Sequence, residues 1–343
     1  MIYHWECIFR PGVSADCGFL KSLRILALSL LLLSAHCLWL PVNAQTLGPV
    51  DIVSIDTDLV NLNVSIFNRN ASQIPTALQQ KDFSVFENGS PQEISFFAST
   101  ETPFDLVLLL DLSGSTSDKI SLIRKSSKRF VDAARPNDRI AIVTFTADIE
   151  VISKLTSDQA ALKKRIDDIE KPRGGTNFWD ALRFVLEHVC AQSRAEHRRS
   201  AVIVMTDGVD NALPDVYGDG SMTTFDELLN VVKHSDTLVL PIYLDTEKEA
   251  NFVSTPRSAY AMARQQLALL ASESGNSVYQ ARKVKDLEDV YPQVMRDLST
   301  VYSIGYRPTH RARDGSWRDV TVQLSGHSEL AVRTRQGYYA SRQ

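Results

Sequence analysis

Five oxygen-bearing side chains in this chain have the types and the spacing that suit a divalent cation. Three of them lie within the sequence DLSGS, one lies in GGTN, and one lies in MTDG. In chain order the candidates are Asp111, Ser113, Ser115, Thr176 and Asp207. Carboxylates and hydroxyls are hard ligands, and the set contains no His or Cys, so it favours Mg²⁺, Mn²⁺ or Ca²⁺ over zinc.

The elements expected to position these side chains are buried strands. Residues 104–110 (FDLVLLL) and 201–204 are continuous apolar runs, which are typical of parallel strands covered on both faces. Asp111 and Asp207 follow these runs, at or just beyond the carboxyl end of each strand. Ligands of open α/β sheets bind at that end of the strands, so we expect the cation there.

Taken together, the DxSxS sequence, the GGTN threonine and the TDG aspartate resemble the metal-ion-dependent adhesion site of von Willebrand factor A domains. The resemblance is complete at all five positions and covers residues 102–301. It implies that Ser113 and Ser115 bind the cation directly, and that Asp111, Thr176 and Asp207 bind it directly or through water. In that family one coordination position is open to an Asp or Glu carboxylate of a partner protein, so the cation would bridge two proteins.

Three other interpretations of the same residues stay open. Asp111 and Ser113 could simply cap a helix starting near Ser117, since Asp and Ser are preferred there; both roles can hold at once. A divalent ion with an open position could also activate water for hydrolysis, and a metal-independent scaffold of the cell envelope is a further alternative. The chain lacks a G-x-S-x-G elbow at Ser113 and a phosphate-binding G-x-x-x-x-G-K-[ST] sequence, so we predict a binding protein rather than an enzyme.

Polar loops after two of the expected strands are candidates for partner recognition. Residues 209–223 and 245–257 should leave the edge of the sheet that carries the cation, and loops on a rigid scaffold often select the partner. The residues expected to contact a partner are Asn177, Asp210, Asp215, Tyr217 and Asp245.

The first 44 residues have the pattern of a secretory signal peptide. Lys21 and Arg24 precede the apolar residues 25–33, and the small-x-small sequence VNA ends at Ala44. Cys37 raises a lipoprotein alternative, but His36 stands where a small residue is expected. The predicted location is therefore secreted, periplasmic or extracellular, with membrane contact only through the signal peptide.

Charge and cysteine content narrow the possible partners and bonds. The chain of 343 residues has 37 basic and 41 acidic residues; residues 1–44 contain three of the basic and two of the acidic ones, which leaves about −5 for the remainder. This mildly acidic balance gives no excess of positive charge to attract nucleic acid, so we do not expect nucleic acid as a partner. Cys190 is the only cysteine beyond residue 44, so no intramolecular disulfide is expected, and its place on an apolar helix face predicts burial.

Short alternating strands are expected on both sides of the central region. Residues 45–101 and 302–343 contain them, with a hairpin turn at Asn88-Gly89, and we expect the two flanks to pair into one small β-sandwich. The sequences KDFSVFENGSPQEISFF, YSIGYRP and VRTRQGYY in these flanks resemble a bacterial group of secreted proteins related to von Willebrand factor A.

Alternating apolar strands and amphipathic helices predict an α/β fold for residues 102–301. The expected architecture is Rossmann-like: a doubly wound, mostly parallel sheet with helices on both faces and one antiparallel edge strand reached through a hairpin at residues 147–148. Helices are expected at residues 117–134, 158–169, 178–190, 224–234, 259–272 and 284–298. Pro241 falls inside an expected strand, residues 238–244, where it predicts a bulge.

Overall fold

The computed structural model describes residues 59–68, 78–170, 174–196, 198–247, 255–281 and 286–342. The predicted signal peptide, with Cys37, lies outside these residues. None of the helices in the described ranges is long and apolar enough to cross a membrane.

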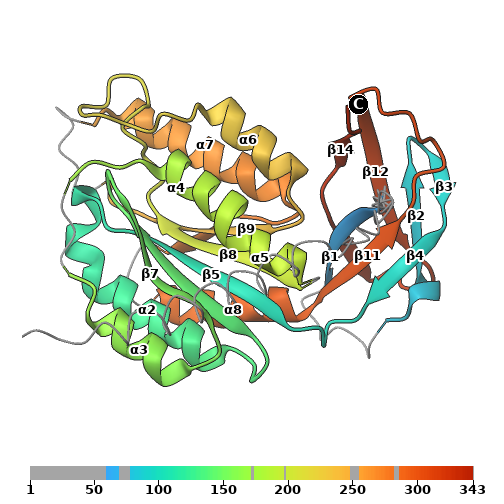
Figure 1. The fold of residues 1–343 in the computed structure, drawn as a ribbon, viewed down its shortest axis with the longest axis horizontal. Coiled ribbons are helices and arrows are strands. Elements are labelled where there is room, and N and C mark those ends of the chain that lie inside the picture. The colour runs from blue at the N-terminus through green and yellow to red at the C-terminus, as the bar shows by residue number, and fades with distance from the viewer. Residues whose placement is uncertain are drawn as a thin grey trace, which may run out of the picture. The chain divides into compact units, whose positions relative to one another are not determined.

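The central sheet confirms the predicted α/β architecture (Figure 1). Its strands are β5 (Phe104–Asp111), β6 (Arg139–Phe145), β7 (Ile149–Thr156), β8 (Arg199–Thr206), β9 (Leu238–Leu244) and β10 (Tyr279–Ala281). They lie in the order β10-β9-β8-β5-β6-β7. Every neighbouring pair is parallel except β6 and β7, which form the expected antiparallel hairpin at one edge.

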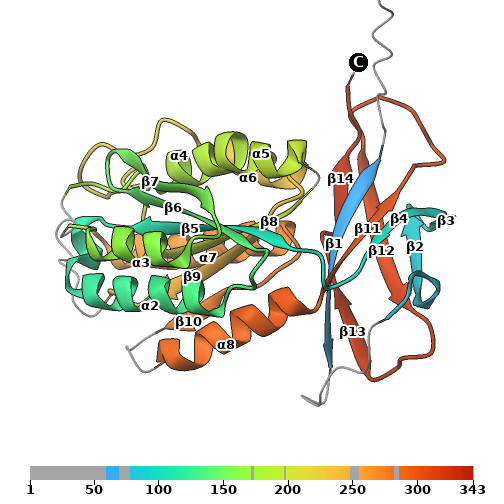
Figure 2. The same ribbon diagram turned by 60° about the horizontal axis from the view of Figure 1, so that its bottom comes forward.

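Helices cover both faces of this sheet (Figure 2). They are α2 (Ile120–Ala133), α3 (Gln159–Asp167), α4 (Phe178–Phe184), α5 (Cys190–Ala195), α6 (Phe225–His234), α7 (Arg257–Glu273) and α8 (Asp286–Ser299). The two cores use alternate residues of β5: Leu106 and Leu108 pack with α2, α3 and α8, whereas Val107 and Leu109 pack with α4, α6 and α7. Because every residue of β5 is buried, the strand fixes the position of the Asp111 that ends it.

Two of the expected helices differ in their details. The helix expected at residues 178–190 runs on to residue 195 in three pieces, with the π-helical segment Val185–Val189 between α4 and α5. The helix expected from residue 117 begins earlier, as the 3₁₀ segment η2 (Gly114–Lys119) that leads into α2. Cys190 is buried in the core, as predicted.

The bulge expected at Pro241 is wrong. The parallel register between β8 and β9 runs through Val204 and Pro241 without a shift. On its other side β9 pairs with β10 only at Ile242, Tyr243 and Leu244, so Pro241 lies just before that ladder begins. A proline is tolerated where no ladder bond requires its missing N–H, and the strand therefore stays regular.

Strands from the two flanks combine in two further sheets. The first has the order β13-β1-β11-β4 and the second has the order β14-β12-β2-β3. Their bounds are β1 (Val60–Asn68), β2 (Phe83–Glu87), β3 (Ser90–Gln92), β4 (Ile94–Ala98), β11 (Val301–Tyr306), β12 (Trp317–Leu324), β13 (Leu330–Arg333) and β14 (Gly337–Tyr339). In each sheet, strands that precede residue 101 pair with strands that follow residue 300.

The two flanking sheets share one apolar core. Side chains of β1 and β11 from one sheet pack with side chains of β2 and β12 from the other. The predicted Asn88-Gly89 turn joins β2 to β3, with φ values of 47° and 78° at its two residues, as a tight hairpin requires. The exact boundaries of this sandwich along the chain stay a prediction.

Candidate metal centre

The five predicted cation ligands lie at strand ends and on loops at the carboxyl edge of the central sheet. Parallel pairing of β5 with β8 sets Leu110 beside Met205, so the strand ends that carry Asp111 and Asp207 are neighbours. The loop with Thr176 is joined to the loop after β5, because the N–H of Gly114 donates to the carbonyl of Gly174 at 3.3 Å. Asp111 and Asp207 are both 0% exposed.

Asp111 is held in place by the loop that follows it. Its Oδ1 accepts a hydrogen bond from the Ser113 N–H at 2.9 Å, and its Oδ2 accepts one from Thr206 Oγ1 at 2.5 Å. The hydroxyl of Thr116 donates to the carbonyl oxygens of Asp111 and Ser113 and closes the turn. The hydroxyl oxygens of Ser113 and Ser115 lie 3.2 Å apart, so the two converge.

The helix-cap interpretation of these residues is not what the structure shows. Ser113 occupies the N-cap position of η2, but its side chain makes no capping hydrogen bond there. Asp111 accepts the N–H of Ser113 within the loop itself rather than an N–H of the helix. The Ser113 hydroxyl therefore faces its neighbour Ser115 instead of satisfying the helix end.

Asp207 is held in the same manner as Asp111. Its Oδ1 accepts a hydrogen bond from the Val209 N–H at 3.0 Å, and its Oδ2 accepts one from Thr246 Oγ1 at 2.7 Å. Thr246 follows β9, the next strand of the sheet, so three adjacent strand ends contribute to the centre. The Ser115 hydroxyl also opposes the effect of burial and lowers the pKa of Asp207, which connects the DLSGS loop electrostatically to the MTDG loop.

Burial makes the two carboxylates costly to ionise together. It raises the pKa of Asp111 to about 7, with the charge of Asp207 as the second cause. Burial also raises the pKa of Asp207, against the opposing effect of its hydrogen bonds from Thr246 and Val209. Every hydrogen bond found between the described residues and these carboxylates comes from a hydroxyl or a backbone amide.

This donor set fits a hard divalent cation. Two buried carboxylates that no Lys or Arg of the described residues neutralises are stabilised by a positive charge between them. Three hydroxyls complete a set made only of oxygen, the kind that Mg²⁺, Mn²⁺ and Ca²⁺ bind. Within the described ranges, no three His, Cys, Asp or Glu side chains form a group that could hold a metal ion.

The residues expected to contact a partner differ in their exposure. Asp215 and Tyr217 are exposed on the loop after β8, and Asp245 is half-buried on the loop after β9. Asn177 is half-buried, and its Nδ2 donates to the Ala147 carbonyl. The prediction that Asp210 contacts a partner is wrong, because Asp210 is 0% exposed. Its carboxylate accepts hydrogen bonds from its own loop and from α4, so it stabilises the loop.

Three residues with clear structural roles were not predicted from the sequence. Thr206 and Thr246 orient the two carboxylates, and Asn211 is joined to the backbone of Thr176. The positions of the two threonines could have predicted this role, because both lie at or just beyond the carboxyl ends of predicted strands, as the proposed ligands Asp111 and Asp207 do. The role of Asn211 had no such signal, since its partner is 35 positions away along the chain.

We expect Gly208→Ala to destabilise the protein more than Gly89→Ala does. Both glycines have positive φ, +75° and +78°, so each substitution costs about 1–2 kcal/mol from backbone conformation. A Cβ at Gly208 would lie 2.7 Å from Cδ1 of Leu267, whereas one at Gly89 would have no described atom within 4 Å. Urea denaturation measures the difference; equal losses would show that Leu267 moves aside without cost.

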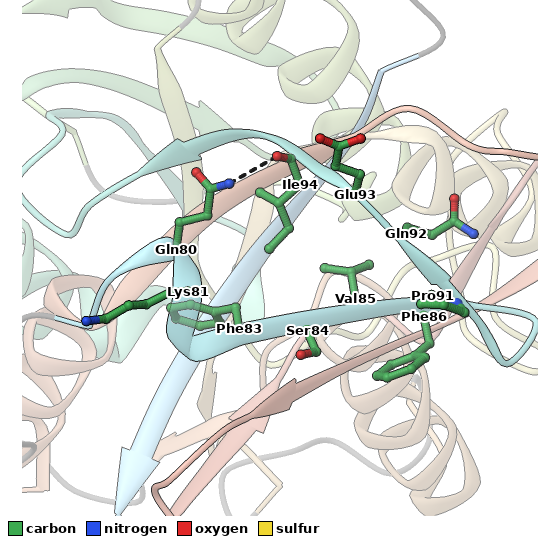
Figure 3. Close-up of a pocket in the computed structure, with 10 residues that line it drawn as sticks. All are labelled: Gln80, Lys81, Phe83, Ser84, Val85, Phe86, Pro91, Gln92, Glu93 and Ile94. Carbon is green, nitrogen blue, oxygen red and sulfur yellow. Dashed lines mark hydrogen bonds between the residues drawn. The ribbon is translucent and has the colours of Figure 1, made fainter.

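A hollow in the flanking sheets is separate from this centre. It opens beside β2, β3 and β4, and Gln80 Nε2 at its rim donates to the Ile94 carbonyl at 3.1 Å (Figure 3). Phe83 and Val85 contribute apolar surface, and Lys81 and Glu93 are the charged residues in its lining. It shares no residue with the candidate ligands.

Comparison with known proteins identifies the central region. The model of the von Willebrand factor type A domain matches residues 105–293. An uncharacterised protein of Borreliella burgdorferi is 26% identical over 117 residues, which are 32% of this chain and 33% of that protein. The chain therefore matches about a third of the length of this curated relative.

Solved structures with a similar fold include proteins of several kinds. The von Willebrand factor type A structure from Catenulispora acidiphila is 14% identical, with a TM-score of 0.45, and the match covers 78% of this chain and 65% of that one. The vWF domain of a type V pili tip protein from Porphyromonas gingivalis is 15% identical, with a TM-score of 0.42 and coverage of 56% and 95%. Proximal thread matrix protein 1 from the mussel byssus, with a zinc-occupied MIDAS motif, is 19% identical, with a TM-score of 0.47 and coverage of 61% and 48%.

Proposed function

The chain belongs to the von Willebrand factor type A domain family, and from this premise we propose that it binds another protein through a divalent cation. The cation would be held by the five residues at the carboxyl edge of the sheet, namely Asp111, Ser113, Ser115, Thr176 and Asp207. An Asp or Glu carboxylate of the partner would complete its coordination. Mg²⁺ is the proposed cation, with Mn²⁺ and Ca²⁺ as the other members of the same class.

One observation carries this proposal: two carboxylates that are 0% exposed lie at adjacent strand ends beside converging serine hydroxyls. A cation offsets the cost of burying both charges, and the hydroxyls add ligands without adding negative charge. The bound cation would then keep enough positive charge to attract a carboxylate from outside. The protein's own part is to hold these oxygens rigid through Thr116, Thr206 and Thr246.

Binding rather than hydrolysis is the activity that this geometry supports. A hydrolytic centre needs a general base within hydrogen-bond reach of the attacking water. Asp111 and Asp207 each already accept hydrogen bonds on both carboxylate oxygens, and those bonds hold them as ligands. We therefore propose an adhesion or docking protein, and we assign no catalytic residue.

We further propose that the protein acts outside the cytoplasm. The positively charged residues before an apolar segment at residues 25–33, and the VNA sequence at residues 42–44, carry this part of the proposal. Sequencing the amino terminus of the protein recovered from its native cells tests it. An amino terminus at Gln45 is the expected result, and uncleaved protein in the cytoplasm would contradict it.

Calorimetric titration of Mg²⁺, Mn²⁺ and Ca²⁺ into the chelator-treated protein tests the metal centre. We expect one saturable site, and we expect Ser113→Ala to lose it, because the serine hydroxyl is a proposed direct ligand. Ser153→Ala is a matched control, since the Ser153 hydroxyl lies on edge strand β7 and donates to the Lys154 carbonyl there. Binding that persists in Ser113→Ala, or its absence from the parent protein, would contradict the proposal.

A further inference from the structure

The loop between β8 and α6, residues 208–223, presents two large apolar side chains to solvent beside the metal centre. Tyr217 is 85% exposed and Met222 is 91% exposed. The next most exposed large apolar residue among those described is Phe96, at 47%. Single exposed apolar residues are ordinary, but two so fully exposed on one loop at a binding edge point to a contact surface.

This loop is held firmly from within. The buried carboxylate of Asp210 accepts hydrogen bonds from the N–H groups of Trp179, Ala212 and Ser221, and from the Ser221 hydroxyl. On α4, the carboxylate of Asp180 accepts the N–H groups of Met222 and Thr223 at 2.8 Å each. The backbone that carries Met222 is therefore fixed before any partner arrives, which lowers the entropy lost on binding.

The same loop is joined directly to a proposed metal ligand. Asn211 and Thr176 exchange two hydrogen bonds: the Asn211 N–H donates to the Thr176 carbonyl at 3.0 Å, and the Thr176 N–H donates to Asn211 Oδ1 at 3.1 Å. Asn211 Nδ2 also donates to the Tyr217 carbonyl at 3.0 Å. One side chain thus connects the backbone of Tyr217 to the backbone of Thr176.

The charge of the loop limits which partner fits it. Residues 208–223 contain Asp210, Asp215 and Asp219 but no Lys, Arg or His. Asp210 is buried, whereas Asp215 and Asp219 are exposed. A partner that brings only a carboxylate to the cation would meet repulsion from these two acids, and a nearby Lys or Arg on the partner removes that repulsion.

We propose that residues 208–223 select the partner by a three-part pattern. The pattern is an Asp or Glu for the cation, apolar side chains that pack against Tyr217 or Met222, and Lys or Arg side chains that face Asp215 or Asp219. This inference rests on the proposed function, because the cation supplies the contact that brings the partner segment to the loop.

A library of random peptides tests this pattern directly. Each bead carries a peptide with one fixed Glu and four random positions on each side; the beads are captured by the protein in Mg²⁺ and released by chelator. We expect the released peptides to be enriched in large apolar residues and in Lys or Arg near the fixed Glu. We expect the double variant Tyr217→Ser, Met222→Ser to bind them at least about tenfold more weakly, since exposed aromatic and apolar anchors dominate such contacts.

Three controls separate this inference from the metal centre. Met262→Ser on α7, which removes a side chain that is 38% exposed, should leave peptide binding unchanged. The Tyr217→Ser, Met222→Ser variant should keep the parent's Mg²⁺ affinity, which shows that its fold and its metal ligands are intact. The double variant Asp215→Asn, Asp219→Asn should lose the preference for Lys or Arg and keep the preference for apolar residues.

Two outcomes would overturn the inference in different ways. Chelator-released peptides without apolar or basic enrichment, or with unchanged affinity for Tyr217→Ser, Met222→Ser, would refute the role of the loop and leave the cation bridge standing. A library from which chelator releases no peptide would refute the cation bridge itself, and the proposed selection would fail with it.

Discussion

Asp111→Asn is expected to abolish cation binding and, in the presence of chelator, to make the protein more stable. The side chain is 0% exposed and burial, with the charge of Asp207, raises its pKa to about 7. Removing one of two buried negative charges removes the free-energy cost of keeping both ionised. The Thr206 hydroxyl, which donates to Asp111 Oδ2 in the parent protein, can turn to accept a hydrogen bond from the new amide NH₂ group. Each pKa unit is worth about 1.4 kcal/mol, so we expect a gain of roughly 1–4 kcal/mol at pH 8. Cation affinity should fall by roughly 100-fold or more. Mutation of a residue that only supports a metal ligand already costs about 10–100-fold, and Asp111 is itself a proposed ligand.

The pH dependence of this gain follows from the direction of the pKa shift. A carboxyl whose pKa is raised in the folded state binds its proton more tightly there than in the unfolded chain. The folded protein without cation therefore loses stability as pH rises from the ordinary value of 3.8 towards about 7. The amide of the Asp111→Asn variant does not titrate, so the advantage of the variant should be largest at pH 8 and should shrink towards pH 5.

Thermal unfolding in chelator and in Mg²⁺, at pH 5 and pH 8, measures these effects. We expect Mg²⁺ to raise the melting temperature of the parent protein and to leave that of Asp111→Asn unchanged. Asp210→Asn is the matched control: that carboxylate is equally buried but receives four hydrogen bonds, so its amide would face donors and the variant should lose stability. A melting temperature of Asp111→Asn below that of the parent in chelator at pH 8 would show that the two carboxylates do not destabilise each other.

Arg318→Met is expected to cause a large loss of stability in the flanking sheets. Arg318 and Glu87 form an ion pair at 3.2 Å with both side chains 2% exposed. The hydroxyls of Tyr306 and Tyr338 each donate to Glu87 Oε2 at 2.8 Å, and Arg318 also donates to the carbonyls of His310 and Ala312. Loss of the guanidinium leaves a buried carboxylate without its counter-charge, which costs about 3–5 kcal/mol.

Urea denaturation followed by tryptophan fluorescence measures this loss locally. In the protein without residues 1–44, Trp179 and Trp317 are the only tryptophans, one on α4 and one on β12, so Trp179→Phe isolates the signal of the flanking sheets. The double variant Glu87→Gln, Arg318→Met should recover much of the loss, because the amide oxygen still accepts from the tyrosines. Arg183→Met is the control, because it breaks the ion pair between Arg183 and Glu187 in the central region, where the two side chains are 40% and 38% exposed. It should cost less than about 0.5 kcal/mol of stability. A loss that small for Arg318→Met would contradict the assigned role of the pair.

The sequence by itself determined the central architecture and the proposed ligand set. Apolar runs such as residues 104–110 are long enough and uniform enough to be buried strands, and their alternation with amphipathic helices leaves a mostly parallel sheet as the solution. Parallel strands bring their carboxyl ends to one edge, so the residues at or just beyond those ends could be placed together from the sequence. That rule put Asp111 and Asp207 side by side although they are far apart in the chain.

Only the tertiary structure decided how these residues are held and which of their neighbours face solvent. The same residue type has opposite roles in one loop: Asp210 is buried under four hydrogen bonds, whereas Asp215 is exposed, and no periodicity in a loop distinguishes them. Pro241 stays in a regular strand because its neighbour β10 begins one residue later, a fact of register between distant segments. The hydrogen bonds between Asn211 and Thr176 likewise depend on backbone groups that come within reach only after folding. Strands and their ends follow from burial, a property of residue type, whereas loop contacts follow from hydrogen-bond partners that only the folded chain brings within reach.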